Sequence, residues 1–261
     1  MKGWLLFVPA YNCAPQLPRT LAQVAALDPA DRARFAEVMV VDNGSADGGP
    51  AVAVAWAAAH LRDVPVLVVR NDANYGLGGS HKVAFQRCLD QGHAGVIVLH
   101  GDDQGRLADL LPTVIADEGR TECVLGARFM RGSRLAGYSL HRVAANVVFD
   151  LLFSIATRAA LWDLGSGLNA YTRAFLERRV WEGCADDLTF NYHLIVRTVR
   201  AGASIRFVPI SWREEDQVSN AKLFRHGVTM LGILWRTLVS PAAFCATDHA
   251  TTRPPRTWTP A

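Results

Sequence analysis

Short apolar runs recur along the first half of the chain, and each is followed by a polar or glycine-bearing segment. The segments between them carry apolar residues at helical spacing, as in Leu17, Leu21 and Val24. Alternating strands and helices form βαβ units, and continuously apolar strands are covered on both faces of a mostly parallel sheet. The first half is therefore predicted to be α/β. The expected strands are 4–8, 38–41, 64–69, 95–99 and 123–125, and the expected helices lie around 17–27, 51–61, 83–89 and 107–115.

Longer amphipathic segments dominate the second half. Helices are predicted around 140–160, 186–200 and 222–238, with a strand at 204–210. From residue 246 the mixture of Thr, Pro and Arg shows no apolar period, which predicts a disordered tail over 246–261. The remaining 1–245 are expected to form a single domain.

Composition excludes several classes of protein. Half of the 261 residues are apolar and a fifth are charged, which sets aside disordered, collagen-like and coiled-coil chains. A net charge of +3 is too small to indicate a nucleic-acid partner. The five cysteines show no C-x-x-C spacing and are expected to be reduced thiols, and the apolar run before Pro9 is too short for a signal peptide, so a cytoplasmic location is predicted. Two apolar stretches, 143–162 and 228–239, are interrupted or too short to span a bilayer but suit a membrane surface.

Polar clusters follow four of the expected strands. They read P-A-Y-N at 9–12, D-N-G-S at 42–45, N-Y-G-L-G-G at 74–79 and H-G-D-D-Q at 100–104. One such cluster is an ordinary turn or helix cap, but the carboxyl ends of parallel strands meet at one edge of a sheet, where ligands bind. Four clusters in succession therefore predict a binding site.

The motifs resemble those of the inverting family-two glycosyltransferases of GT-A fold, and among them the polyprenyl-phosphate (dolichol-phosphate) mannosyl- and glucosyltransferases. That family reads P-A-Y-N, V-V-D-x-[GN]-S, N-x-G-x-[GA], D-x-D-x-Q, G-[SA]-R-[FY] and S-G-[FL]-x-A, followed by a closing S-K element. The counterparts here are 9–12, 40–45, 74–78, 100–104, 126–129 and 166–170, followed by Ser219 and Lys222.

The resemblance implies a Rossmann-like, mostly parallel central sheet flanked by helices, with C-terminal amphipathic helices. A nucleotide-sugar half over 1–126 would precede an acceptor half over 127–245. The implied reaction is metal-dependent transfer of a sugar from GDP-mannose or a UDP-hexose to a polyprenyl phosphate at the cytoplasmic membrane face.

The donor site is expected at the strand ends. By resemblance, the nucleotide slot is formed by Pro9, Tyr11, Asn12 and Asp42. The family pattern also places Asn74, Gly76 and Gly78 beside the ribose and diphosphate, where glycine permits close approach and a helix N-terminus favours anions.

A divalent cation, Mg²⁺ or Mn²⁺, is expected on the donor diphosphate to stabilise the departing nucleotide. Its predicted protein partners are His100, Asp102 and Gln104, with Asp102 as the principal ligand. A histidine stands where the family has an acidic residue, and this predicts either a shift in preference toward manganese or other transition metals, which imidazole suits, or weaker metal binding. His100 is alternatively a direct contact of the sugar or diphosphate.

The acceptor determines whether a base is needed. A lipid phosphate arrives ionised and requires only cations, for which the predicted residues are Arg128, Arg142, Arg213 and Lys222. A sugar hydroxyl requires a general base, and Asp186 or Asp187 then becomes catalytic. Asp163 is a third carboxylate, facing the donor sugar or capping a turn. A catalytically silent nucleotide-sugar binder is the other alternative, suggested by His100.

Overall fold

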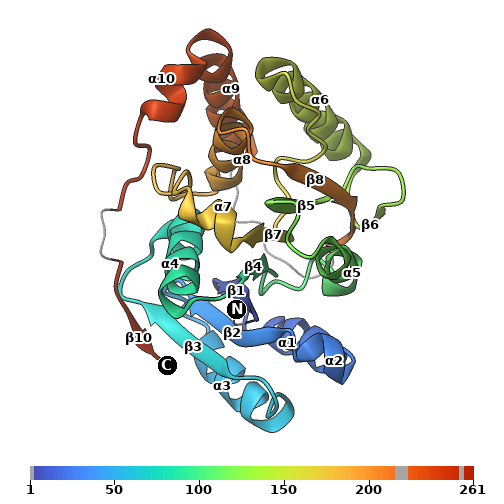
Figure 1. The fold of residues 1–261 in the computed structure, drawn as a ribbon, viewed down its shortest axis with the longest axis vertical. Helices are drawn as coiled ribbons and strands as arrows, with labels where there is room; N and C mark the ends of the chain where they lie inside the picture. The colour runs from blue at the N-terminus through green and yellow to red at the C-terminus, as the bar shows by residue number, and fades with distance from the viewer. Residues whose placement is uncertain (1–2, 215–222, 253–255) are drawn as a thin grey trace.

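One eight-stranded sheet runs through both predicted halves of the chain in the order β10-β3-β2-β1-β4-β7-β5-β8 (Figure 1). The computed structural model describes residues 3–214, 223–252 and 256–261. The strands of this sheet are β1 (Trp4–Ala10), β2 (Phe35–Asp42), β3 (Val66–Asn71), β4 (Gly95–Val98), β5 (Cys123–Ala127), β7 (Asn169–Thr172), β8 (Ile205–Pro209) and β10 (Trp258–Pro260). A second, two-stranded sheet pairs β6 (Arg134–Ala136) with β9 (Ser211–Arg213).

Most neighbouring strands are parallel, which confirms the predicted α/β class. β3, β2, β1 and β4 run parallel to one another, as do β5 and β8. β7 lies antiparallel between β4 and β5, with Asn169 opposite both Val98 and Leu125. The start of β7 therefore reaches the edge at which β4 and β5 end, and this register brings the S-G-L-N-A motif to the predicted site.

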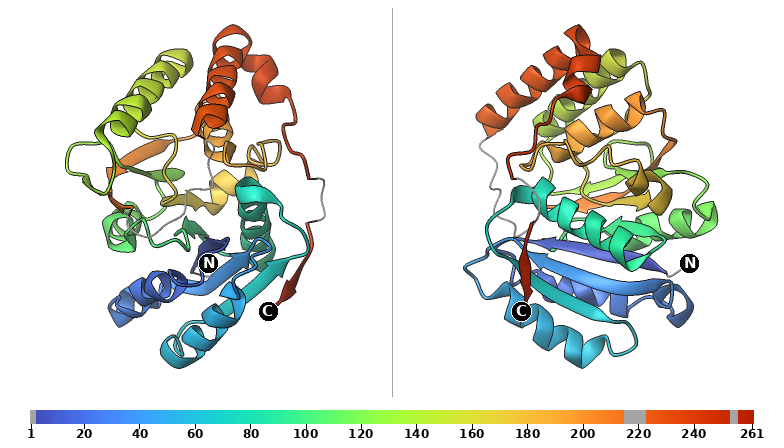
Figure 2. Two further views of the ribbon diagram at one scale, coloured as in Figure 1. Left: turned by 180° about the vertical axis from the view of Figure 1, so that it is seen from behind. Right: turned by 60° about the vertical axis from the view of Figure 1, so that its left-hand side comes forward.

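Helices cover both faces of the sheet (Figure 2). Val38 and Val40 of β2 pack into one apolar core with α1, α3 and α5, while Met39 and Val41 pack into a second core with α4, α7 and α8. Burial on both faces explains why the strands are continuously apolar. The helices are α1 (Leu17–Ala25), α2 (Pro29–Arg32), α3 (Gly49–His60), α4 (Gly76–Gln91), α5 (Leu107–Asp117), α6 (Leu140–Thr157), α7 (Arg173–Glu177), α8 (Phe190–Arg200), α9 (Leu223–Val239) and α10 (Pro241–Ala246).

The predicted disordered tail over 246–261 is wrong for the residues that the structure describes there. Trp258 to Pro260 form β10, which pairs antiparallel with β3 at the edge of the sheet. The prediction failed because short segments without an apolar period can still be ordered by backbone hydrogen bonds to an existing sheet edge. Figures 1 and 2 show the C-terminus beside β3, far from α10.

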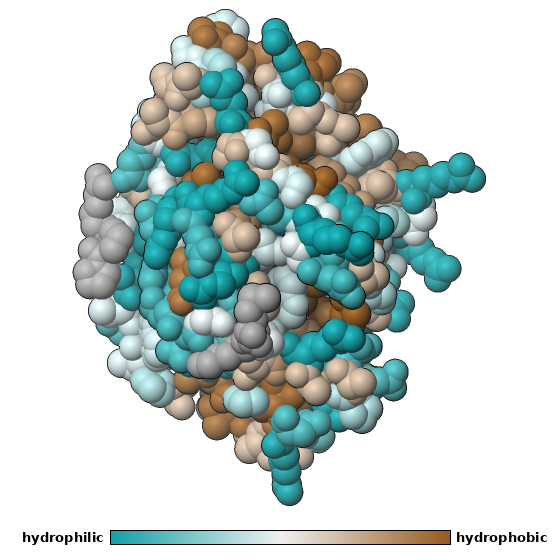
Figure 3. Space-filling model, viewed as in Figure 1, coloured by the Kyte–Doolittle hydropathy of each residue, from teal (hydrophilic) through white to brown (hydrophobic). Residues whose placement is uncertain are grey.

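α6 and α9 form one end of the molecule and expose apolar side chains there. In α6, Leu151 and Ile155 are about three-fifths exposed, and Figure 3 shows hydrophobic residues gathered at this end. Among the described residues, α6 alone is long and apolar enough to cross a membrane by length and composition, with 11% of its residues buried. Its inward face packs on the protein through Phe153 and Asp150.

Asp150 is a buried carboxyl on the inward face of α6. One of its oxygens accepts a hydrogen bond from the Leu164 amide at 3.1 Å, and the other is buried without a hydrogen-bond partner among the described residues. Burial raises the pKa of Asp150 to about 7, and the negative charge of Asp163 adds to the effect, against the opposing influence of Arg128. Folding therefore shifts the protonation equilibrium of this carboxyl toward the protonated form, relative to the unfolded chain.

We expect Asp150→Asn to stabilise the protein at about pH 8 by an amount on the order of 2 kcal/mol. A pKa raised by folding contributes stability that is present below the unfolded value and is lost as pH rises through the folded value. The amide retains the acceptor for Leu164 and carries no charge to desolvate. Urea unfolding at about pH 8 and about pH 5 measures the effect, which should shrink at the lower pH; an equal difference at both would contradict it.

Candidate functional site

The ends of β1, β2 and β3 are tied together by polar side chains. The Asn12 amide donates to Ser45 Oγ at 2.9 Å, and Asn12 Oδ1 accepts from the Ala46 amide. Asp42 accepts from the Ser45 amide and lies 3.7 Å from Arg70 Nε. Asn12 and Asp42 are thus part of one strand-end network. Pro9 and Ala10 are buried at the end of β1, and Tyr11 beyond them is 42% exposed, so this aromatic ring is open to a ligand.

Asn43 joins the strand ends to the glycine-containing segment 74–79. Its Oδ1 accepts from the Tyr75 amide at 2.8 Å, and its Nδ2 donates to Asn74 Oδ1 at 2.8 Å. Asn74 in turn accepts from the Gly76 amide at 2.9 Å. Asn74 and Gly76 were predicted site residues. Asn43 lies in the D-N-G-S motif but was not predicted to have a role, because its contacts join neighbouring strand ends and a motif does not reveal them.

The glycines of this segment pack closely against another part of the chain, and their predicted place beside the donor stays a prediction. A Cβ on Gly76 would lie 2.3 Å from the Asp186 carbonyl oxygen, and one on Gly78 would lie 2.3 Å from the Ala185 carbonyl oxygen. The amides of Gly78 and Gly79 donate to the Asp186 carbonyl at 2.7 and 3.2 Å. These glycines therefore allow close packing against 185–187, and two amides at the start of α4 are already used within the protein.

The segment after β4 presents two adjacent aspartates in different environments. Asp103, at φ +60, has a buried carboxylate that accepts from Arg19, Gln23 and Arg213. Asp102 is half-buried. The loss of water around its carboxylate, together with the negative charges of Asp103 and Glu214, raises its pKa to about 6. A cation beside Asp102 would offset this repulsion. Of the two carboxylates, Asp102 is the one in a suitable environment for a metal ion.

His100 packs against the S-G motif. A Cβ on Gly167 would lie 2.6 Å from both Cε1 and Nε2 of His100, so the imidazole occupies the space that a side chain at 167 would fill. Burial lowers the pKa of His100 to about 4, and the nearby Arg128 charge acts in the same direction. The ring is neutral, and its Nε2 is buried without a hydrogen-bond partner among the described residues. Packing on Gly167 is the role that the contacts give to His100; ligation stays a prediction.

Arg128 and Asp163 form a buried two-pronged ion pair at the end of β5. Arg128 Nε and Nη2 donate to the two Asp163 oxygens at 2.7 and 2.8 Å, and the Arg128 amide donates to Asp163 Oδ2 at 2.9 Å. Asp163 also accepts from the Gly165 amide at 2.9 Å. The pair thereby shapes the turn that leads to Ser166 and Gly167. Of the two roles considered for Asp163, the contacts are those of a turn-capping carboxylate.

The other predicted cations also carry carboxylate partners. Arg142 of α6 makes a two-pronged pair with Glu214, and Arg213 pairs with Asp103. The side chains of Arg142 and Arg213 are 31% and 39% exposed, against 8% for Arg128. Lys222 and Ser219 lie outside the described residues. Among the three predicted cations that the structure describes, Arg142 and Arg213 are therefore the two that are accessible to an incoming anion.

Of the two candidate bases, Asp186 is buried and Asp187 is exposed. The Asp186 carboxylate is 2% exposed and accepts hydrogen bonds from Lys82, Arg256 and the amides of Thr251 and Thr252. Burial opposes ionisation of this group, but those hydrogen bonds and the Arg256 charge hold its pKa below the ordinary value. Asp187 accepts from the Thr189 amide and hydroxyl at 2.8 and 2.5 Å, as the cap of the turn before α8. The sequence analysis missed Lys82 and Arg256 because each lies far from Asp186 in sequence.

No group of three or more His, Cys, Asp or Glu side chains poised for a metal ion occurs within the described ranges. Magnesium and related ions are nevertheless often held by one or two carboxylates together with substrate phosphates. Asp102 fits that arrangement because a bound cation would offset the repulsion between its carboxylate and the negative charges of Asp103 and Glu214. The backbone amide of Gln104 donates to Asp102 Oδ1 at 3.2 Å and orients this carboxylate.

Residues 6–182 match the family model described as Glycosyl transferase family 2. The match covers well over half of the chain, so the protein belongs to this family and is a glycosyltransferase. The resemblance noted from the motifs is confirmed.

Two relatives act on lipid phosphates by name. The chain is 24% identical over 213 residues to a polyprenol monophosphomannose synthase of Mycolicibacterium smegmatis, covering 81% of this chain and 78% of the relative. It is 26% identical over 185 residues to an undecaprenyl-phosphate 4-deoxy-4-formamido-L-arabinose transferase of Pseudomonas fluorescens, covering 71% of this chain and 51% of that relative. The chain thus aligns with about half of the second protein.

Solved structures share the fold. Glucosyl-3-phosphoglycerate synthase from Mycobacterium tuberculosis, in complex with Mn²⁺, UDP and glucosyl-3-phosphoglycerate, superposes with a TM-score of 0.61 at 17% identity, over 94% of this chain and 81% of that one. Its complex with Mn²⁺ and UDP-glucose gives a TM-score of 0.62, over 94% of this chain and 80% of that one. The predicted GT-A architecture is confirmed by this similarity.

We expect Gly167→Ala to destabilise the protein by about 1–3 kcal/mol, because its methyl group overlaps the His100 ring. In the His100→Ala background, the same Gly167→Ala substitution should cost less stability than it does in wild type. Thermal unfolding of the four proteins in this double-mutant cycle measures the coupling. Additive effects would show that the two residues are not in contact.

Proposed function

We propose that this glycosyltransferase moves a sugar from GDP-mannose or a UDP-hexose to a polyprenyl phosphate, with inversion at the anomeric carbon. The observation that carries the acceptor class is the state of the two candidate bases. Asp186 is buried and saturated with hydrogen bonds, so it is not placed to deprotonate a hydroxyl. The exposed Asp187 uses its Oδ1 to cap a turn. A lipid phosphate needs no base because its attacking oxygen is already ionised. The two relatives named for polyprenyl acceptors support the same acceptor.

Asp102 is proposed to hold a divalent cation, Mg²⁺ or Mn²⁺, together with the donor diphosphate. When bound, such an ion stabilises negative charge on the departing nucleotide. Gln104 supports Asp102 through its backbone amide. The proposed nucleotide slot is lined by Pro9, Tyr11 and Asp42. The solved complexes of glucosyl-3-phosphoglycerate synthase contain Mn²⁺ with UDP or UDP-glucose, which supports this assignment.

The acceptor phosphate is proposed to contact Arg142 and Arg213. Both are partly exposed, and both lie near the segment that follows β4. Arg213 pairs with Asp103 of that segment. Arg142 pairs with Glu214, whose negative charge helps to raise the pKa of Asp102. Their carboxylate partners hold the guanidinium groups in place before the phosphate arrives, which lowers the cost of ordering them on binding. Arg128 is too buried for direct contact and instead supports the turn at 163–167.

The exposed apolar faces of α6 and α9 are proposed to rest on the membrane that contains the acceptor. α6 carries Arg142, so a bilayer on this end of the molecule would bring a polyprenyl phosphate close to that cation. The exposed apolar positions of both helices are Leu140, Val147, Val148, Leu151, Leu152, Ile155, Val228, Leu231, Trp235, Leu238 and Val239. An amphipathic face of this kind suits peripheral attachment at the cytoplasmic side.

We expect Asp102→Asn to abolish transfer of label from nucleotide sugar to polyprenyl phosphate, because the amide binds a divalent cation poorly. The measurement uses a panel of labelled GDP- and UDP-sugars, Mn²⁺ or Mg²⁺, and a short polyprenyl phosphate, with and without chelator. The surface variant Asp63→Asn serves as a matched control. Full activity of folded Asp102→Asn, or chelator-resistant transfer, would contradict the metal assignment.

The acceptor alternatives are separated by the same assay. Chelator-sensitive label in the lipid product supports the proposal. Nucleotide release that depends on an added hydroxyl acceptor would favour the glycan alternative, and Asp187→Asn should then lose activity. Donor binding without turnover on any acceptor would favour the silent nucleotide-sugar binder.

We expect the double variant Leu151→Glu, Ile155→Glu to lose at least about tenfold in affinity for vesicles, since two large apolar side chains no longer enter the bilayer interface. Flotation with vesicles of phosphatidylcholine and phosphatidylglycerol measures binding. Val54→Glu on α3 is the matched control, as Val54 is also exposed but lies away from α6. Equal flotation of all three proteins would count against the membrane-facing surface.

A further inference from the structure

The C-terminal strap, defined as residues 247–252 and 256–261, crosses from the α10 end of the molecule to the far edge of the sheet (Figures 1 and 2). It is held along its length by hydrogen bonds. The His249 amide donates to the Gly183 carbonyl at 3.0 Å, and the Ala261 amide donates to the Val68 carbonyl at 3.0 Å. Between these points β10 pairs with β3. The strap is therefore an integral layer on the protein.

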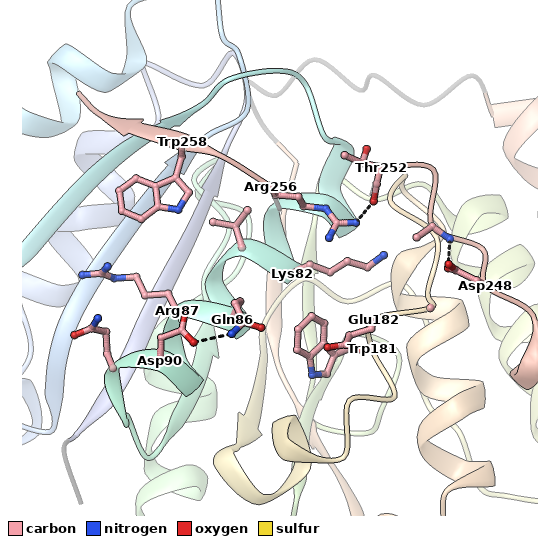
Figure 4. A pocket seen from close by; sticks show the side chains of 14 residues that line it. Lys82, Gln86, Arg87, Asp90, Trp181, Glu182, Asp248, Thr252, Arg256 and Trp258 are labelled. Atoms are coloured by element: carbon pink, nitrogen blue, oxygen red, sulfur yellow. Dashed lines mark hydrogen bonds between the residues drawn. The ribbon is translucent and has the colours of Figure 1, made fainter. Parts of the chain in front are cut away.

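The middle of the strap converges on the Asp186 carboxylate. The amides of Thr251 and Thr252 donate to Asp186 Oδ2 at 2.8 and 2.6 Å. Arg256 Nη2 donates to Asp186 Oδ1 at 2.9 Å and to the Thr252 carbonyl at 2.6 Å. Lys82 Nζ of α4 donates to the same Asp186 Oδ1 at 2.7 Å. Figure 4 shows Arg256 and Thr252 of the strap beside Lys82.

The same segment packs against the donor loop, defined as residues 74–79. The Asp186 carbonyl accepts from the Gly78 and Gly79 amides, and its oxygen leaves no room for a side chain at Gly76. The side chain of Asp186 thus binds the strap while its main chain binds the donor loop. A shift of Asp186 would move the donor loop.

Tyr75 makes a second, direct connection. Its hydroxyl donates to the Thr257 carbonyl and accepts from the Thr257 amide, both at 3.1 Å. Its backbone amide donates to Asn43 at the β2 end. Tyr75 therefore ties the strap to the strand ends through one residue of the donor loop.

We propose that the C-terminal strap is a positioning element for the donor loop, acting through Asp186 and Tyr75 and thereby setting affinity for the nucleotide sugar. This inference rests on the proposed function of the strand-end site. It makes Asp186 a positioning residue in place of a general base. It also accounts for the five hydrogen bonds that the buried Asp186 carboxylate accepts from Lys82, Thr251, Thr252 and Arg256.

The charges in this cluster indicate which substitution is informative. Asp186 faces two cations, Lys82 and Arg256, so removal of Arg256 leaves a neutral Lys82–Asp186 pair. Removal of Lys82 or Asp186 would instead leave a deeply buried group with a broken pair, at a high cost in stability. Arg256→Gln therefore loosens the strap while the core ion pair remains.

The test compares Arg256→Gln, Arg256→Lys and Tyr75→Phe with wild type, and uses Arg206→Gln as a matched control. Arg206 is a surface arginine 3.8 Å from Asp117 on another part of the molecule. Calorimetry with UDP and GDP gives the nucleotide affinity, and steady-state kinetics give separate KM values for donor and lipid acceptor. Hydrogen exchange at the Gly78 and Gly79 amides reports on the donor loop without any substrate.

We expect Arg256→Gln to raise the donor KM and nucleotide Kd about tenfold, with acceptor KM unchanged. Arg256→Lys should recover part of the affinity, Tyr75→Phe should weaken it less, and Arg206→Gln should match wild type. Faster exchange at Gly78 and Gly79 should accompany the loss.

Unchanged nucleotide affinity and exchange in folded Arg256→Gln would overturn the proposal, as would equal rises in donor and acceptor KM. If Arg256→Gln does not fold, Tyr75→Phe decides between the same outcomes. A wild-type protein that binds no nucleotide would refute the proposed function, whereas faster exchange at Gly78 and Gly79 in Arg256→Gln would still support the link between strap and loop.

Discussion

Burial of the central sheet on both faces is the constraint on which the rest of the structure depends. Strands such as β1 and β2 are apolar along almost all of their length, with Glu37 as the exception in β2, so the other polar groups collect where the strands end. Parallel strands bring those ends to one edge. The buried amides and carboxylates there must then find partners among themselves, as Asn43 does with Asn71, Asn74 and Tyr75.

Paired charges organise the second half of the site in the same way. Arg128 with Asp163, Arg142 with Glu214 and Arg213 with Asp103 each combine a cation with a carboxylate. The buried pair shapes a turn, and the two partly exposed pairs leave their cations within reach of an anion. The division follows from exposure, because a guanidinium that is already desolvated and satisfied has little left to offer a substrate.

The sequence predicted the architecture well because its main signal, the alternation of apolar strands and helical stripes, is local. The family follows from motifs that are short and ordered along the chain, and the same motifs predict Asp102 as the principal metal ligand. Individual roles were harder to predict. The glycines at 76 and 78 match a phosphate-binding pattern, yet the contacts they make are with 185–187, and nothing in the motif encodes that neighbour. Asp186 resembles a catalytic base by position, but its partners Lys82 and Arg256 come from distant parts of the chain.

The sequence by itself determined the α/β fold, the family and the edge of the sheet where the proposed site lies, because hydrophobic period and motif order survive without any knowledge of contacts. Only the tertiary structure decided that His100 fills the space above Gly167, that the Asp103 carboxylate is buried between Arg19 and Arg213, and that the C-terminus is a strap beside β3. These outcomes depend on which distant groups meet and on how much water reaches them. Neither burial nor hydrogen-bond partnership can be read from residue type and spacing alone.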